Sequence, residues 1–394
     1  MKRKIFRSHI KLKVIIPIFI VLLALLLLFP IRISKASSNQ IIYVPQQYSS
    51  LQDAINAATP GTTIYVSQGY LYNGSILIQN KQDLTIIGQG NVVLNYGGYG
   101  NTTIIDSSYI TIENLNISGG LDINSSSQIS LKNVNVSGII SLPNQVLGDD
   151  LLVYDVNSLY MQNVIAYWTM PGMTYTTYQG INITDSSNLT LNNVISYALS
   201  GYGVYIDNSN GLTMQNDLFN SPSNGGIGIG LVNLTKAVLT DVNSNQSYQL
   251  YVLNVSSLSI NRMDYSSSYQ TGGANITNVN QLTINDANFN GLSISQIFKT
   301  TLNNVLDLGS LSINGVGSLT SAILNSVSVY QYVDISNLSS ISLNNIKVYN
   351  TNFQTSTTYG LYLTNFQNSQ ITDSNIWGGM NITNGSYLNI TNSL

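Results

Sequence analysis

Cysteine is absent from this chain of 394 residues, so no disulfide can stabilise it. Charged residues are scarce, at 8% of the total, and the single histidine is His9, close to the N-terminus. Histidine acid–base chemistry and histidine metal sites are therefore excluded from the rest of the chain. Neither a metal ion nor a cofactor is expected.

Positive charge is concentrated at the start of the chain, where eight of the 14 Lys and Arg residues lie within the first 35 positions. From Ala36 onward there are six basic and 17 acidic residues, which give a net charge of −11. Because nucleic acids are polyanions, this sign disfavours a nucleic acid partner.

Residues 1–36 are typical of a signal peptide or an N-terminal membrane anchor. The uncharged run from Val14 to Phe29 is 16 residues long, shorter than the ~20 residues of a full span. Ser34-Lys35-Ala36 is a candidate cleavage site. The basic residues before the run predict that residues 37–394 lie outside the cell, secreted or held at the extracellular face of the membrane.

What the chain has in abundance is one repeated pattern of alternating apolar residues. Alternation with a period of two predicts β-strands, because successive side chains point to opposite faces. The second apolar position of this pattern recurs 14 times between Ile86 and Ile390, at intervals of 18 to 30 residues. Clear copies are Ile129–Val134, Leu159–Val164, Leu189–Val194, Leu282–Ala287 and Ile341–Ile346. The chain is therefore predicted to be a repeat protein.

A corner follows each copy, two residues after that apolar position, and 11 of the 14 corners carry Asn or Asp. These residues tolerate the left-handed backbone conformation and can bond the local backbone, so a tight turn is expected there. Stacked corners would also let the side chains bond along the stack. The exceptions are Gly88, Arg262 and Ser326, and Arg262 is interpreted as marking an irregular coil.

Repeats of about 23 residues with an asparagine corner resemble the parallel β-helix of the pectin-lyase-like superfamily, from about Ile41 onward. The resemblance implies an all-β fold, a single-stranded right-handed parallel β-helix of about 13–14 coils over residues 37–394. It says little about activity, because this fold carries lyases, hydrolases, tailspikes, adhesins and non-catalytic surface proteins. The composition, poor in charge and rich in Asn, Ser, Thr and Tyr, resembles that of archaeal surface proteins.

An N-terminal cap is expected over residues 41–66. Ser50 and Asp53 have the spacing of a capping box at the start of a short helix. Apolar residues at Leu51, Ala54, Ile55 and Ala58 form one stripe, which suits a helix that covers the open edge of the first coil.

In proteins that this chain resembles, the outward residues of the first strand in each coil usually form the functional surface. Glycosidases need two carboxyl groups ~5 to 9.5 Å apart, whereas Asp122 and Asp334 are nine coils apart, on the order of 43 Å. The lysine or arginine beside an acidic cluster that lyases use is also missing. No catalytic pair is therefore expected on this face. Its outward residues are predicted to be Asp122, Leu152, Asn182, Tyr205, Gly230, Val252, Asn275, Ser293, Asp334, Tyr362 and Asn381.

One acidic group resembles the Gly-Asp-Asp element of polygalacturonases, namely Gly148-Asp149-Asp150, followed by Asp155. The histidine and the basic residues that those enzymes combine with it are missing here. We therefore interpret this segment as a solvated loop. A polysaccharide lyase or glycoside hydrolase that uses Asp149, Asp150 and Asp155 is the alternative.

Aromatic residues gather where the two longest intervals predict long loops, near residues 138–151 and 166–180. Trp168, Tyr175 and Tyr178 lie in the second loop, and Tyr205 and Tyr251 are expected nearby, with Gly230 between them. Aromatic rings suit the C–H faces of sugars, so these five residues are predicted to bind a glycan. Packing of the loops against themselves is an equally good explanation.

Fifteen Asn-x-Ser/Thr sequences are present, and Asn73, Asn101, Asn182, Asn245 and Asn337 are candidate glycosylation sites. The leading hypothesis is an exported, surface-tethered scaffold or glycan-binding module without catalytic activity, whose partner is a surface polysaccharide or glycoprotein. The enzyme described above is the first alternative. The second is a structural subunit that associates with itself or a partner through its C-terminal coil, because the chain stops inside a repeat at Tyr387–Leu394.

Overall fold

The computed structural model describes residues 39–95, 100–137, 149–167, 179–198, 201–221, 226–244, 248–264, 273–349 and 359–394. The predicted leader lies outside these ranges, as do Trp168, Tyr175, Tyr178 and Asn245. Within the ranges given, no helix has both the length and the apolar character needed to cross a membrane. Residues Asn39–Leu394 form one compact unit, which is described below by itself.

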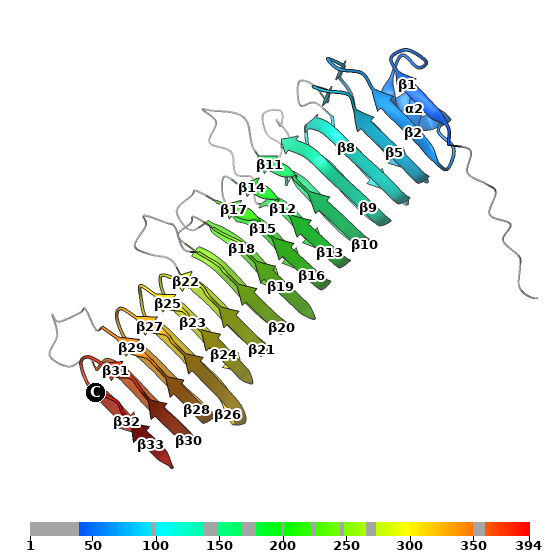
Figure 1. The fold of residues 1–394 in the computed structure, drawn as a ribbon. Coiled ribbons are helices and arrows are strands. Elements are labelled where there is room, and N and C mark those ends of the chain that lie inside the picture. The colour runs from blue at the N-terminus through cyan, green and yellow to red at the C-terminus, as the bar shows by residue number, and fades with distance from the viewer. Residues whose placement is uncertain are drawn as a thin grey trace, which may run out of the picture. The chain divides into compact units, whose positions relative to one another are not determined.

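Strands account for nearly all of the regular structure in the described ranges, and the helix α2 is short (Figure 1). The elements are β1 (Ile41–Val44), α2 (Leu51–Ala57), β2 (Thr62–Val66), β3 (Leu71–Tyr72), β4 (Ile76–Gln79), β5 (Gln82–Gly88), β6 (Val93–Leu94), β7 (Thr102–Ile105), β8 (Ser108–Ser118), β9 (Leu121–Ser137), β10 (Leu151–Gln162), β11 (Ile165–Tyr167), β12 (Gln179–Thr184), β13 (Ser187–Asn192), β14 (Ile195–Tyr197), β15 (Tyr202–Asp207), β16 (Asn210–Gln215), β17 (Leu218–Asn220), β18 (Ile227–Val232), β19 (Lys236–Thr240), β20 (Tyr248–Asn261), β21 (Ala274–Asn285), β22 (Asn288–Phe289), β23 (Leu292–Ile297), β24 (Lys299–Asn303), β25 (Leu306–Asp307), β26 (Leu311–Asn325), β27 (Ser328–Val329), β28 (Val333–Asn344), β29 (Lys347–Val348), β30 (Leu361–Thr372), β31 (Asn375–Ile376), β32 (Met380–Thr383) and β33 (Leu388–Thr391).

The strands stack in parallel, each one paired with its counterpart one repeat later, as Figure 1 shows for β12, β15 and β18. Each coil has three faces, illustrated by β12 on the first, β13 on the second and β14 on the third. In later coils the third-face strands β22, β25, β27, β29 and β31 form a separate sheet. The predicted all-β parallel β-helix is confirmed by this pairing.

The core runs through the middle of the stack and is built from the same position of successive coils. Ile183, Ile206 and Leu231 are aligned by the strand register, and each is 0% exposed. Burial of such side chains contributes roughly 1.5 to 3 kcal/mol each before chain entropy is subtracted. Val252 continues this inward series, so its predicted outward position is wrong, and the outward residue of β20 is Tyr251.

The corner residues have the left-handed conformation that their type predicts. Asn133, Asn163 and Asn193 have φ between 52° and 55°, and their side chains bond in a column along the stack. The Nδ2 of Asn163 donates to Oδ1 of Asn133, and the Nδ2 of Asn193 donates to Oδ1 of Asn163, both at 2.8 Å. A second column at the other corner includes Asn233, Asn254 and Asn278. In both columns the amide donates toward the N-terminal coil.

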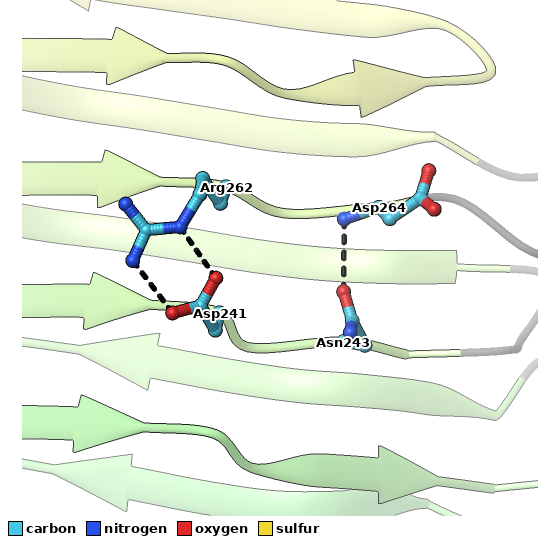
Figure 2. Close-up of polar contacts among 4 residues, drawn as sticks. All are labelled: Asp241, Asn243, Arg262 and Asp264. Atoms are coloured by element: carbon cyan, nitrogen blue, oxygen red, sulfur yellow. Dashed lines mark hydrogen bonds and ion pairs between the residues drawn. The ribbon is translucent and has the colours of Figure 1, made fainter.

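Arg262 occupies a regular corner, with φ 55°, so its interpretation as an irregular coil is wrong. Its guanidinium donates two hydrogen bonds of 2.6 Å to the two carboxylate oxygens of Asp241, one coil earlier (Figure 2). This bond lowers the pKa of Asp241. In the same coils the backbone N–H of Asp264 donates to Oδ1 of Asn243 at 2.9 Å. The arginine therefore replaces an amide within an ordinary column.

The Arg262 corner yields a prediction about backbone conformation. We expect Arg262→Asn to leave the thermal midpoint nearly unchanged, because asparagine tolerates positive φ and its amide can reach Asp241. Arg262→Val should lower the midpoint by several degrees, because a β-branched residue is strained at φ 55°. Circular dichroism melts compare the three proteins. Equal decreases of the thermal midpoint in both variants would mean that the ion pair, rather than the backbone conformation, determines stability at this corner.

The expected short helix and its capping box are present at the start of the stack. The side chain of Ser50 accepts a hydrogen bond from the backbone N–H of Asp53, and its hydroxyl donates to Oδ2 of Asp53 at 2.7 Å. Leu51, Ala54 and Ile55 are buried on the inner face of α2. This helix starts the core of the first coils.

At the other end, β32 and β33 both pair with β30. Ile382 and Ile390 continue the inward series of that strand, and they are 37% and 41% exposed. Association through this coil stays a prediction.

Candidate functional site

On the first face, outward side chains are paired from coil to coil in an unbroken register. We define the first-face series as the outward residues that are paired from coil to coil. They are Asp122, Leu152, Asn182, Tyr205, Gly230, Tyr251, Asn275, Ser293, Ser312, Asp334, Tyr362 and Asn381. Apart from Val252 and the omission of Ser312, this is the series that the repeat predicts.

Tyr202, Tyr205 and Tyr251 form a tyrosine cluster around Gly230. The rings of Tyr202 and Tyr205 lie 4.9 Å apart at 46°. A Cβ atom built on Gly230 would lie 2.5 Å from the Tyr202 ring and 2.9 Å from the Tyr205 ring. Both rings therefore cover this glycine, and a larger residue would displace them. Tyr251 follows on the next coil, directly paired with Gly230.

Burial raises the pKa of the Tyr202 and Tyr205 hydroxyls, and the neighbouring Tyr251 raises both further. The phenols of Tyr202 and Tyr205 therefore stay neutral over the physiological range and can donate hydrogen bonds. Tyr202 was missed from the sequence, since it lies three residues before the predicted Tyr205, ahead of the alternating pattern.

A carboxyl pair, Asp122 and Asp149, lies next to this cluster along the first face. Asp149 accepts a hydrogen bond from the backbone N–H of Gln179 at 3.1 Å and one from Nδ2 of Asn182 at 2.8 Å. Asp122 accepts one from Nδ2 of Asn101 at 3.3 Å.

Burial is the main reason that the pKa of both carboxyl groups is raised, and repulsion by Asp122 adds to the effect on Asp149. No catalytic pair was expected because Asp122 and Asp334 are far apart. That argument overlooked the carboxyl group of Asp149, which lies close enough to repel Asp122. The ion pairs observed within the described ranges involve other acids, Glu113 and Asp241.

The other two predicted acidic residues point elsewhere. Asp150 is 0% exposed, so its interpretation as part of a solvated loop is wrong. Both residues lie just before β10, where Asp149 is partly exposed and the adjacent Asp150 is buried together with Leu151. Asp155 is exposed at the corner after the first half of β10, and it lines a cavity of about 290 Å³ with Asp185. Six residues of extended chain, ~20 Å, separate Asp155 from Asp149.

The candidate glycosylation sites differ in how their amides are used. Asn73 is exposed. Asn101 and Asn182 donate to the carboxyl pair. Asn337 donates to Asn314 and accepts from Asn365, both at 2.8 Å. A glycan attached to Asn101, Asn182 or Asn337 would occupy an amide nitrogen that donates a hydrogen bond within the folded chain.

Metal-binding groups do not gather in the part of the chain that the structure describes, where no three His, Cys, Asp or Glu side chains are placed to hold one ion. The candidate site is thus composed of two carboxyl groups, amides and tyrosine rings.

The fold makes this chain a parallel β-helix protein with a tyrosine and carboxyl surface on its first face. No protein-family model matches the sequence, and no curated protein matches it. Among solved structures, similar chains include the catalytic domain of a GH87 α-1,3-glucanase. That chain is 14% identical, with a TM-score of 0.37, over 91% of this chain and 67% of the glucanase.

A family 28 exopolygalacturonase of Yersinia enterocolitica is 13% identical, with a TM-score of 0.31, over 89% of this chain and 78% of its own. PfbA, a surface adhesin of Streptococcus pneumoniae, is 12% identical, with a TM-score of 0.22, over 85% and 77%. At these identities and scores, the function has to be argued from this chain's own residues.

Proposed function

We propose that this chain is an exported glycan-binding protein that holds a polysaccharide against its first face. The observation that carries the proposal is the tyrosine cluster, in which two rings cover Gly230 beside Tyr251. Aromatic faces stack well on the C–H groups of a sugar ring, and the half-buried phenols can donate to sugar hydroxyls. The basic, apolar leader segment supports export.

The carboxyl pair would complete such a site. Asn182 lies one coil before Tyr205 in the first-face series and is bonded to Asp149. Amide and carboxyl groups beside an aromatic surface supply the polar contacts that orient a bound sugar. The rigid stacked strands hold these groups at fixed spacings, which reduces the entropy lost on binding.

Titration calorimetry of the full chain with a panel of oligosaccharides tests this proposal. For a ligand that binds, Tyr205→Ala and Tyr251→Ala should each weaken the affinity by roughly fivefold or more. Gly230→Val should do the same by pushing the two rings aside. Tyr109→Ala is the matched control, because Tyr109 is 57% exposed and lies away from the first-face series. Unchanged affinity in all three site variants would contradict the proposal.

A second candidate function is favoured by the raised pKa of the carboxyl pair. A carboxyl group that keeps its proton closer to neutral pH can act as a general acid, and a charged neighbour can assist a glycoside hydrolase. Asp122 and Asp149 would be the residues concerned, rather than the trio that includes Asp150 and Asp155. Release of new reducing ends from a bound polysaccharide, abolished in Asp149→Asn and in Asp122→Asn, would establish this function. Binding without product release in the wild-type protein would exclude it.

A further inference from the structure

A second aromatic surface lies on the third face, further toward the C-terminal end of the stack. Tyr330, Tyr349 and Trp377 each follow directly after a third-face strand, which is β27, β29 and β31 respectively. Figure 1 shows these strands one after another along one edge of the stack. The backbone N–H of Tyr349 donates to Val329 and that of Trp377 to Val348, so the three residues occupy equivalent places in successive coils. We call them the aromatic ladder.

The rings of the aromatic ladder contact one another but remain open to solvent. Tyr330 and Tyr349 lie 4.8 Å apart at 35°, and Tyr349 and Trp377 lie 5.9 Å apart at 74°. Trp377 is 54% exposed and Tyr330 is 39% exposed. Large aromatic side chains left open in a continuous row are typical of a binding surface.

A lysine stands beside this row. Lys347 is exposed on β29, two residues before Tyr349, and is paired in register with Ser328 on one side and Asn375 on the other. In the described ranges the basic partners of the ion pairs are Lys132 and Arg262, so no carboxylate neutralises Lys347 there. Lys347 and Tyr349 lie two residues apart and therefore on the same outward side, so the lysine places a positive charge beside the aromatic ladder.

We propose that the aromatic ladder and Lys347 form a second binding site, specific for a sugar that carries a negative charge. The rings would stack against the sugar's C–H face, and the ammonium group would pair with a carboxylate or sulfate on it. Asn375 and Ser328, which flank Lys347, would bond the hydroxyl groups. This site uses strands of the third face, so it is separate from the tyrosine cluster and does not depend on the function proposed for that cluster.

Trp377 provides a direct readout of this site. The chain has two tryptophans, so Trp168→Phe in the full chain leaves the fluorescence of Trp377 alone. We would titrate this protein with a galacturonate oligosaccharide, a sulfated oligosaccharide and an uncharged glucose oligosaccharide. Saturable changes are expected with a charged sugar, at an affinity roughly fivefold or more above that for the uncharged one. The two charged sugars distinguish a carboxylate from a sulfate as the preferred group.

Variants in the same background test the roles of the residues. Lys347→Gln should weaken binding of the charged sugar by roughly fivefold while leaving the uncharged sugar unaffected, and Tyr349→Ala should weaken both. Lys299→Gln is the matched control, because it removes the same charge from an exposed strand residue outside the ladder. Thermal midpoints confirm that each variant folds.

Two results would overturn this inference. One is the absence of a saturable change in Trp377 fluorescence with all three sugars. The other is an equal loss of affinity for the charged sugar in Lys347→Gln and Lys299→Gln. Neither result bears on the first face, because Tyr205→Ala is expected to leave the Trp377 titration unchanged. Conversely, a first face that binds nothing would leave a positive Trp377 titration intact.

Discussion

Replacement of Asp307 by alanine is expected to destabilise the folded chain by ~2 to 6 kcal/mol. Asp307 is 0% exposed on the third-face strand β25. Its Oδ1 accepts from the backbone N–H of Gly291 at 2.6 Å and of Gly309 at 2.8 Å, and its Oδ2 accepts from Leu292 at 3.1 Å. Leu292 also donates to Ser310, so alanine would leave the two glycine N–H groups without their acceptor.

Asp307→Asn is the matched control for this prediction. An asparagine keeps the Oδ1 that serves Gly291 and Gly309, and it removes a charge whose burial raises the pKa of this carboxyl. Its Nδ2 cannot accept from the backbone N–H of Leu292, which still donates to Ser310, so its stability should fall far less than that of the alanine variant. Urea unfolding measures the losses, and hydrogen exchange at Gly291 and Gly309 shows whether opening is local, since stacked repeats can unfold in parts. An alanine variant as stable as the asparagine variant would refute the prediction.

The second large effect concerns pH. Asp217 is 2% exposed, and burial raises its pKa from 3.8 to about 7, against two backbone N–H donors that lower it. Between these two values the folded chain holds a proton that the unfolded chain has lost. The free energy of unfolding should therefore fall as the pH rises from about 4 to about 7, by roughly 4 kcal/mol from this one group.

Asp217→Asn should remove this part of the pH dependence. The asparagine resembles the protonated acid, so the two proteins should have similar stabilities near pH 4, and the variant should be the more stable one near pH 8. Urea unfolding of both proteins across this range gives the difference directly, because all other acidic groups are shared. If the difference between the two proteins is the same at both ends of the range, Asp217 does not titrate as argued.

The sequence predicted the stacked coils well because the patterns that indicate them each lie within a few neighbouring residues. Apolar alternation placed residues such as Ile183 and Leu191 in the core, and the corner asparagines have the positive φ expected of them. The interpretation of Arg262 was wrong because it took the departure from Asn or Asp at this corner as a sign of an irregular coil. A long side chain that bonds the preceding carboxylate fills that place as well as an amide does.

The candidate site was only partly predictable, because its residues meet through register across long insertions. Asp149 and Asp122 are 27 positions apart, and the pairing of β9 with β10, which sets Leu152 against Asp122, brings their coils together. The aromatic ladder was missed for a different reason. Its strands have two residues each, too short for alternation to show which side chains point outward.

The common direction of the amide columns has an electrostatic consequence. Each asparagine places its N–H₂ group toward the N-terminal coil, so the side-chain dipoles of a column add together with the positive end at its start. At the second corner the amides end on carboxylates in this direction, because Asn208 donates to Asp185, and the column of Asn278, Asn254 and Asn233 ends on Asp207. The arrangement parallels an anion at the N-terminus of an α-helix, so these few acidic side chains stabilise whole rows of neutral ones.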